Sequence, residues 1–259
     1  MLSGTSYSND APKLDLEQWH VGVALGVGQI TNPLAGGDDI PLIVIPDVAY
    51  YDDQFYFDNG QLGFTLHESN RHVLSIISEI NPENRFFVSW HPANQFVSLN
   101  SSESTNDKAQ SIDISDIKKP DWSLDLGINY QYITQQYAFS LNMLQDISAV
   151  HNGHRASINF KKHWQVGTFR YIAGIGADYI STELAHYYYG IDKRHSLSFT
   201  YQQKSAWIGK ISLDIQKPVS EQVDLIMKLA YQDMSTLDDS PLFEKSSSTT
   251  LFLGVGYVF

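Results

Sequence analysis

Three side chains with the chemistry of a hydrolase lie close together in the sequence. In His67-Glu68-Ser69-Asn70 the histidine and the serine stand two residues apart, and Asn81 follows twelve residues after the serine. Residues two apart in an extended strand point to the same face, so His67 could activate the Ser69 hydroxyl as a nucleophile, with Asn81 in support. A polar turn is the simpler interpretation, because a strand over 71–80 would carry Asn81 to the opposite rim from Ser69.

Acidic pairs and a pair of histidines are the other groups that could do chemistry. Paired carboxylates can bind Ca²⁺ or act as acid and base, but adjacent aspartates in connections are usually turn formers. His151 and His154 flank Asn152-Gly153 at a spacing where a metal could bind, yet no third ligand is evident. We therefore expect no catalytic, cofactor or metal site here, and we interpret as turns Asp38-Asp39, Asp52-Asp53 and Asp238-Asp239.

The composition of the 259 residues excludes several classes of protein. Lysine and arginine number 17 against 29 aspartate and glutamate, a net charge of −12, so no basic stripe could neutralise a nucleic acid. The chain has no cysteine, which excludes disulfides, thiolate zinc sites and cysteine nucleophiles. A membrane-spanning helix needs about 20 apolar residues, whereas the best apolar run, 41–45, is broken by Pro46 and Asp47.

The elements that would position these residues have a period of two. In the stretch 122–132, bulky apolar residues such as Trp122 and Leu124 alternate with Ser123 and Asp125. A soluble sandwich or lipocalin-like barrel would carry Lys, Glu and Thr on the second face, but here Gly, Ala, Ser, Asn and Gln dominate it. Small neutral groups suit a confined interior and an apolar face suits lipid, so the pattern predicts an all-β, antiparallel, up-and-down transmembrane β-barrel. The same alternation occurs in 19–28, 156–164, 169–179, 223–231 and 250–259.

The sequence predicts a single barrel domain over 18–259, after an N-terminal periplasmic extension over 1–17. Twelve strands fit the even number found in single-chain bacterial barrels, with ten as the alternative. With periplasmic termini, the short connections would be periplasmic: 52–53, 81–84, 134–135, 165–166 and 218–221. The long ones would be extracellular: 30–39, 93–121, 182–195 and 234–248. The predicted strands are 18–29, 40–51, 54–67, 71–80, 85–92, 122–133, 136–149, 154–164, 167–181, 196–217, 222–233 and 249–259.

Charged residues fall on the predicted inner face of the strands, where they could form ion pairs that fill the barrel or line a pore. Twelve strands lie between barrels of about 8 strands, which side chains fill, and those of 16–18, which hold a water channel. We therefore expect a narrow or occluded lumen. The interior polar candidates are Asp125, Lys161, Arg170, Asp178, Lys210, Asp214, Asp224 and Lys228.

Aromatic residues near the predicted strand ends are typical of the girdles of membrane barrels. We expect interfacial anchors at Tyr187–Tyr189, Trp122, Trp164 and Trp207.

The final strand ends on an aromatic residue. This ending, with Tyr257 and Phe259, resembles the assembly signal of substrates of the outer-membrane barrel assembly machinery, which it implies as a partner. The chain as a whole resembles the MipA/OmpV family of outer-membrane proteins, the MltA-interacting protein family. That resemblance rests on WHVGVALGVG at 19–28, DIPLIVIPDVAYYDDQFYF at 39–57, YYYGI at 187–191 and SPL at 240–242.

The family resemblance implies a non-enzymatic envelope scaffold or a surface or adhesion protein in the Gram-negative outer membrane. Its implied partners are a lytic transglycosylase and a murein synthase, with outer-membrane lipid and lipopolysaccharide around the barrel. A narrow pore for small solutes is one alternative. The other is a hydrolase resembling outer-membrane phospholipase, although the glycine that follows that motif is Arg71 here. No signal peptide is visible, as expected of a mature exported chain.

Overall fold

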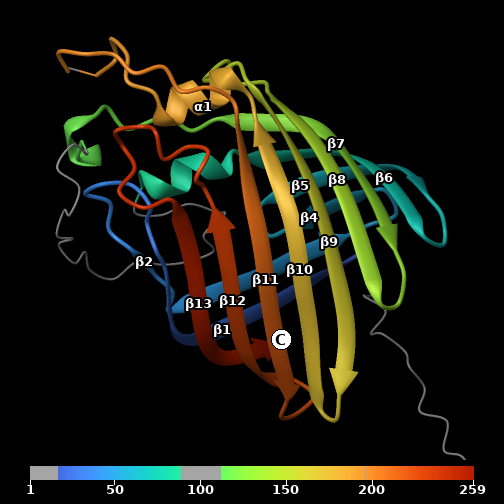
Figure 1. The fold of residues 1–259 in the computed structure, drawn as a ribbon. Helices are drawn as coiled ribbons and strands as arrows, with labels where there is room; N and C mark the ends of the chain where they lie inside the picture. Colours follow the sequence, from blue (N-terminus) through green and yellow to red (C-terminus); the bar gives the residue numbers. More distant parts are fainter. Residues whose placement is uncertain (1–16, 89–111, 196) are drawn as a thin grey trace, which may run out of the picture.

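The computed structural model describes residues 17–88, 112–195 and 197–259. One antiparallel sheet closes on itself where β13 pairs with β1 (Figure 1). Strands β2 and β3 both lie beside β1 and form one interrupted strand, so the barrel has twelve strands, as predicted. The strands are β1 (Gln18–Ile30), β2 (Ile40–Pro41), β3 (Val44–Tyr51), β4 (Phe55–Asp58), β5 (Gln61–Glu68), β6 (His72–Ile80), β7 (Leu124–Ile133), β8 (Tyr137–Asp146), β9 (His154–Val166), β10 (Phe169–Ile180), β11 (Ala206–Pro218), β12 (Val223–Asp233) and β13 (Ser247–Val258).

The alternation decides which way each side chain points. On β1, Trp19 and Val27 are 62% and 73% exposed, whereas Ala24 between them is buried. Large apolar residues are exposed in the same alternating way along the other long strands, so the outer surface of the barrel is apolar, as lipid contact requires. Small and polar residues face the lumen. This sidedness confirms the predicted membrane barrel.

Two of the predicted strands are wrong. Within 54–67 the chain reverses: Asn59 and Gly60 have φ of 48° and 94°, the left-handed values of a two-residue turn, and join β4 to β5 as a hairpin. In the described part of 85–92, the chain forms the 3₁₀ helix η1 (Pro82–Phe86), while 89–92 lie outside the described residues. These two errors offset each other, and the count of twelve holds.

The two ends of the barrel differ in their connections. At the turn end, where both β1 begins and β13 ends, the connections are short: 52–54, 69–71, 134–136, 167–168 and 219–222. Toward the opposite loop end, apart from the two-residue turn 59–60, they are longer: 31–39, 81–123, 147–153, 181–205 and 234–246. Because the hairpin at 59–60 reverses the chain, 81–84 lies at the loop end and not among the short turns as predicted. The periplasmic position of the turn end stays a prediction, and residues 1–16 lie outside the described ones.

The segments at the loop end fold over the mouth of the barrel (Figure 1). Helix α1 (Thr182–Tyr189) begins after Ser181, whose side chain accepts a hydrogen bond from the Leu184 N–H. The 3₁₀ helix η3 (Ile114–Asp116) lies in another of these segments. The strand predicted over 196–217 begins only at Ala206.

No helix in the part of the chain that the structure describes is long and apolar enough to cross a membrane.

Candidate functional site

At the loop-end mouth of the barrel, side chains from several connections pack together as in a protein core. We call this packed set the cap. Its largest members, Tyr188, Tyr189 and Phe243, are at most 2% exposed. The buried residues of the cap are Leu34, Phe86, Phe87, Ile117, Ile180, Leu184, Ala185, Tyr188, Tyr189, Ile191, Ala206, Ile208, Met234, Leu237, Leu242 and Phe243.

Tyr189 connects three segments of the cap. Its hydroxyl donates a hydrogen bond to the Glu83 carboxylate of η1, and its carbonyl accepts one from Ser240 Oγ at 2.6 Å. Its ring packs on Phe243, with the ring centres 5.0 Å apart. Burial raises the pKa of Glu83, against the opposing effect of Arg85, and raises the pKa of the Tyr189 hydroxyl as well. Burial in the cap therefore disfavours the charged form of each group.

Beneath the cap, Asp125 is the centre of a buried polar cluster on the inner wall. Its Oδ2 accepts hydrogen bonds from Asn81 Nδ2 at 2.8 Å and Arg155 Nε at 3.2 Å, and its Oδ1 lies 3.3 Å from His151 Nε2. Arg155 also forms an ion pair with Glu79. Because Asp125 is 1% exposed, these partners replace the water that its charge would otherwise need.

Asp125, Asp146 and His151 form a group of described residues whose potential ligand atoms all lie within 4.8 Å of one another. Hydrogen bonds already occupy most of these atoms. The Asp146 carboxylate accepts four, all from donors of the loop 147–153, and His151 Nδ1 accepts one from a backbone N–H of the same loop. The donor set fits an anchor for this loop better than a metal site. His154, the second histidine of the predicted pair, lies exposed outside the group.

The charged residues predicted for the interior lie at inward positions of β7 and of β9 to β12. Asp125 belongs to the buried cluster, and Lys161 lies opposite Gly174 in the register of β9 and β10. The other side chains are between 19% and 43% exposed, so this part of the lumen is open to water. They form three ion pairs, Arg170–Asp224 at 2.7 Å, Lys210–Asp178 at 2.7 Å and Lys228–Asp214 at 3.9 Å.

The three residues of the hydrolase alternative do not meet. Ser69 lies at the turn end, where its hydroxyl donates to the His72 carbonyl at 3.5 Å. Asn81 is fully buried at the opposite end of β6, where it caps η1 and binds Asp125. His67 is exposed near the turn end. The geometry therefore offers no common site for a nucleophile, a base and their support.

The aromatic anchors divide into two groups. Tyr188 and Tyr189 are buried in the cap, because residues that were expected in an exposed loop form α1 and pack inward, so their predicted interfacial position is wrong. Trp164 and Trp207 lie on the outer face, each beside a tyrosine of a neighbouring strand, with ring centres 5.3 and 5.2 Å apart. Trp122 is also exposed.

The sequence reasoning missed Arg155, Glu79 and Glu83 as residues of the interior. Arg155 and Glu79 occupy inward positions of the alternation, so strand parity was the signal that could have found them. Glu83 is buried because η1 folds into the mouth of the barrel, and no periodic pattern marks that event.

Comparisons with known proteins find a matching family model, curated relatives and solved structures. Residues 21–259 match the family model described as MltA-interacting protein MipA. Putative outer membrane protein YiaT of Escherichia coli, from strain K12 and from O157:H7, is 24% identical over 219 residues, covering 83% of this chain and 81% of the relative. An outer membrane channel from Pseudomonas putida F1 aligns with a TM-score of 0.43 and 12% identity, over 98% of this chain and 100% of that one. OmpT of Vibrio cholerae aligns with a TM-score of 0.38 and 8% identity, over 96% and 99%.

Proposed function

Because the chain belongs to the MltA-interacting protein MipA family, we propose that this outer-membrane β-barrel is a non-enzymatic scaffold that binds a murein transglycosylase. The family description supplies the class of partner. The observation that favours a scaffold over a pore is the cap of buried side chains, which we infer closes one end of the lumen. A barrel closed in this way presents surfaces to partners and keeps its own interior out of contact with them.

We place the binding surface at the turn end, on the periplasmic side where murein lies. Its short turns hold their own hydrogen bonds; the Asp53 N–H, for example, donates to Asp52 Oδ1 at 2.7 Å. A partner that binds such preformed turns loses little conformational entropy from them. Asp52 and Asp53 are exposed and supply negative charge to this surface.

The matched acidic pairs at the two ends of the barrel allow a direct test. The detergent-extracted protein would be used to capture the transglycosylase, with Asp52→Lys/Asp53→Lys at the turn end and Asp238→Lys/Asp239→Lys at the loop end as variants. We expect the turn-end variant to lose capture by about tenfold, since a reversed charge at a rim repels its partner, and the loop-end variant to retain it. Absence of capture by the wild type contradicts the scaffold, and equal capture by both variants contradicts the turn-end surface.

A narrow pore for small solutes is the second candidate. The partly exposed ion pairs below the cap favour it, because water reaches them from within the lumen. Conductance across a planar bilayer separates the two candidates. The cap predicts a silent barrel, and a steady open-channel current would favour the pore.

A further inference from the structure

A cavity of about 300 Å³ lies at the loop end, beside the cap. It is lined by the segments 117–121, 149–150, 187–188 and 194–195, and two of its lining residues, Ile117 and Tyr188, belong to the cap. Its volume is at the lower end of the range of small-molecule sites. We call it the basic cavity, for the charges described next.

Positive charge gathers on the lining of the basic cavity. Lys118, Lys119 and Arg194 line it, and Asp121 is the one acid among the described residues that do so. Asp121 lies 3.8 Å from Lys118, but both side chains are more than 60% exposed, so this pair is weak. Asp192 binds Arg194 Nε at 2.9 Å from outside the lining. In the whole chain acids outnumber bases by 29 to 17, so this excess of cations is local, and it attracts an anion.

His195 adds a buried hydrogen-bond donor to the same lining. The residue is 7% exposed, and its Nδ1 accepts a hydrogen bond from the Lys118 N–H at 3.2 Å. In the neutral ring the proton is therefore on Nε2. Nε2 is buried and has no hydrogen-bond partner among the described residues. A buried N–H without an acceptor is unfavourable, so an oxygen of a ligand in the cavity would stabilise it.

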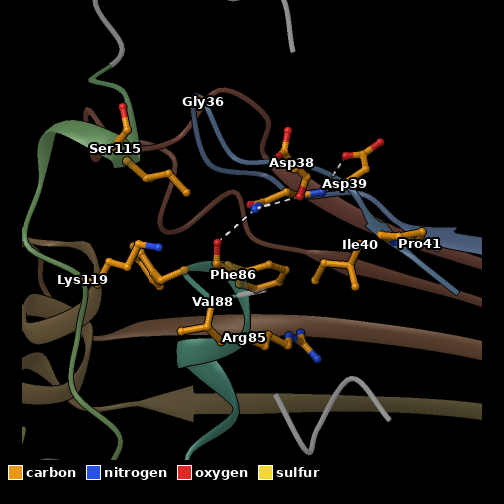
Figure 2. Close-up of a pocket in the computed structure, with 13 residues that line it drawn as sticks. Gly36, Asp38, Asp39, Ile40, Pro41, Arg85, Phe86, Val88, Ser115 and Lys119 are labelled. Carbon is orange, nitrogen blue, oxygen red and sulfur yellow. Dashed lines mark hydrogen bonds between the residues drawn. The ribbon is translucent and has the colours of Figure 1, made fainter. Parts of the chain in front are cut away.

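A larger neighbouring cavity differs in charge. Its volume is about 460 Å³, and Lys119 lines it as well. Figure 2 shows Asp38 and Asp39 at this larger cavity, together with Arg85 and Lys119. Two acids and two cations offset each other there, so the larger cavity does not favour an anion as the basic cavity does.

We propose that the basic cavity binds the phosphate group of a ligand. A phosphate carries up to about two negative charges and three strong acceptor oxygens, which match the three cations and the Nε2–H of His195. A phosphate fills only part of the cavity, and the remaining space fits a small group that bears it, such as a sugar. The Asp121 carboxylate and the Tyr187 hydroxyl on the lining can bond to the hydroxyls of a sugar. The scaffold function plays no part in this inference, so either can fail alone.

Isothermal titration calorimetry tests the proposal on the full chain, extracted in a polyoxyethylene detergent and a phosphate-free buffer. The probes are inorganic phosphate and glucose 1-phosphate, with glucose as the uncharged control. We expect both phosphates to bind and glucose not to bind. Tighter binding of glucose 1-phosphate identifies a phosphorylated sugar as the ligand class, and equal binding of the two identifies free phosphate. Absence of binding by both phosphates, or equal binding of glucose and its phosphate, overturns the proposal.

Matched pairs of lysine variants locate the site. Lys118→Met/Lys119→Met removes two cations of the basic cavity, and Lys193→Met/Lys204→Met removes two exposed lysines of the segment 181–205 that do not line it. We expect the first variant to bind the phosphate probes about tenfold more weakly and the second to bind them as the wild type does. Folded protein would be isolated by its unheated gel mobility before titration. Equal affinities in the two variants would overturn the assignment to this cavity.

Nitrogen NMR asks whether His195 takes part in binding. In protein labelled with ¹⁵N-histidine, the signal of His195 is the one that His195→Asn removes. We expect this Nε2 signal to shift in step with saturation by the phosphate probe, while the signal of His67, exposed near the turn end, stays unchanged. Saturation that leaves the His195 signal unmoved would overturn the proposed site.

Discussion

Arg155 is the residue on which the buried polar cluster depends. It is the only cation that the structure records in direct contact with both Asp125 and Glu79 among the described residues. Its side chain is 9% exposed and that of Asp125 is 1% exposed, so neither charge can turn to water when the other is lost. Removing one partner of such a pair is far more costly than the pair itself is stabilising.

We predict that Arg155→Met lowers the free energy of unfolding by about 3 kcal/mol, because two carboxylates lose their cation in a buried site. Arg170→Met is the matched control: its pair with Asp224 is partly exposed, and we expect a loss of about 1 kcal/mol or less. Urea unfolding in lipid vesicles, followed by tryptophan fluorescence, measures both. Equal losses of unfolding free energy in the two variants would contradict the special dependence of the buried cluster on Arg155.

We predict that His195, in the loop-end segment 181–205, makes the stability of the barrel depend on pH. The residue is 7% exposed, and its Nδ1 accepts a hydrogen bond from the Lys118 N–H at 3.2 Å. Burial lowers the pKa of His195, and the nearby charge of Arg194 lowers it further. The folded protein therefore holds this histidine neutral.

In the unfolded chain the pKa of a histidine is about 6.5. The stabilisation from neutral His195 is therefore complete above that pH and is lost as the pH falls through the lower pKa of the folded state. His195→Asn keeps an acceptor but cannot titrate, so its urea midpoint should fall less than that of the wild type between pH 7.5 and pH 5. His67→Asn, an exposed histidine, is the control. Parallel pH profiles for the wild type and His195→Asn would refute the assignment.

At the scale of elements, long alternating strands were predictable and short ones were not. The ranges predicted for β1, β9, β10, β12 and β13 agree with the structure to within a few residues, because alternation over ten residues is a strong local signal. β4 and β5 were merged because the apolar residues continue through Asn59-Gly60, although this dipeptide is a strong hairpin signal. α1 and η1 were missed because short helices at a barrel mouth are set by packing against other loops.

The hairpin between β4 and β5 gives a prediction at this scale. Asn59→Ala loses three side-chain hydrogen bonds, one accepted from the Val48 N–H and two donated to Asp47 and Asp58, and places alanine at a left-handed φ. Asn152, with φ of 54°, is the matched control, because its alanine variant meets the same backbone strain. We expect Asn59→Ala to cost about 3 kcal/mol more than Asn152→Ala, about 1 kcal/mol for each of the three hydrogen bonds. Equal urea midpoints for the two variants would contradict this.

For the whole molecule, the direction in which the barrel crosses the membrane is the central prediction. The two ends differ in that one carries short turns and the other carries the cap. Bacterial barrels keep short turns in the periplasm and longer loops outside. The turn end and both chain ends should therefore face the periplasm.

The absence of native cysteine makes this prediction simple to test. Ser235→Cys at the loop end and Ser220→Cys at the turn end are both exposed positions. A membrane-impermeant maleimide should label position 235 in intact cells and position 220 only after the cells are broken. Labelling of position 220 alone in intact cells would mean that the barrel is inserted the other way round.

The sequence by itself determined the class of fold and the face of each long strand. Period-two alternation is a local pattern, and the type of each residue indicates whether its side chain faces lipid or the lumen. It also excluded thiol chemistry and helical spans. Only the tertiary structure decided which charges pair, that Asn81 and His151 anchor Asp125, and that Tyr189 joins three segments of the cap. Each of these depends on residues distant in sequence that meet when the barrel closes, and closure depends on the register between strands. No single segment of the sequence carries that information.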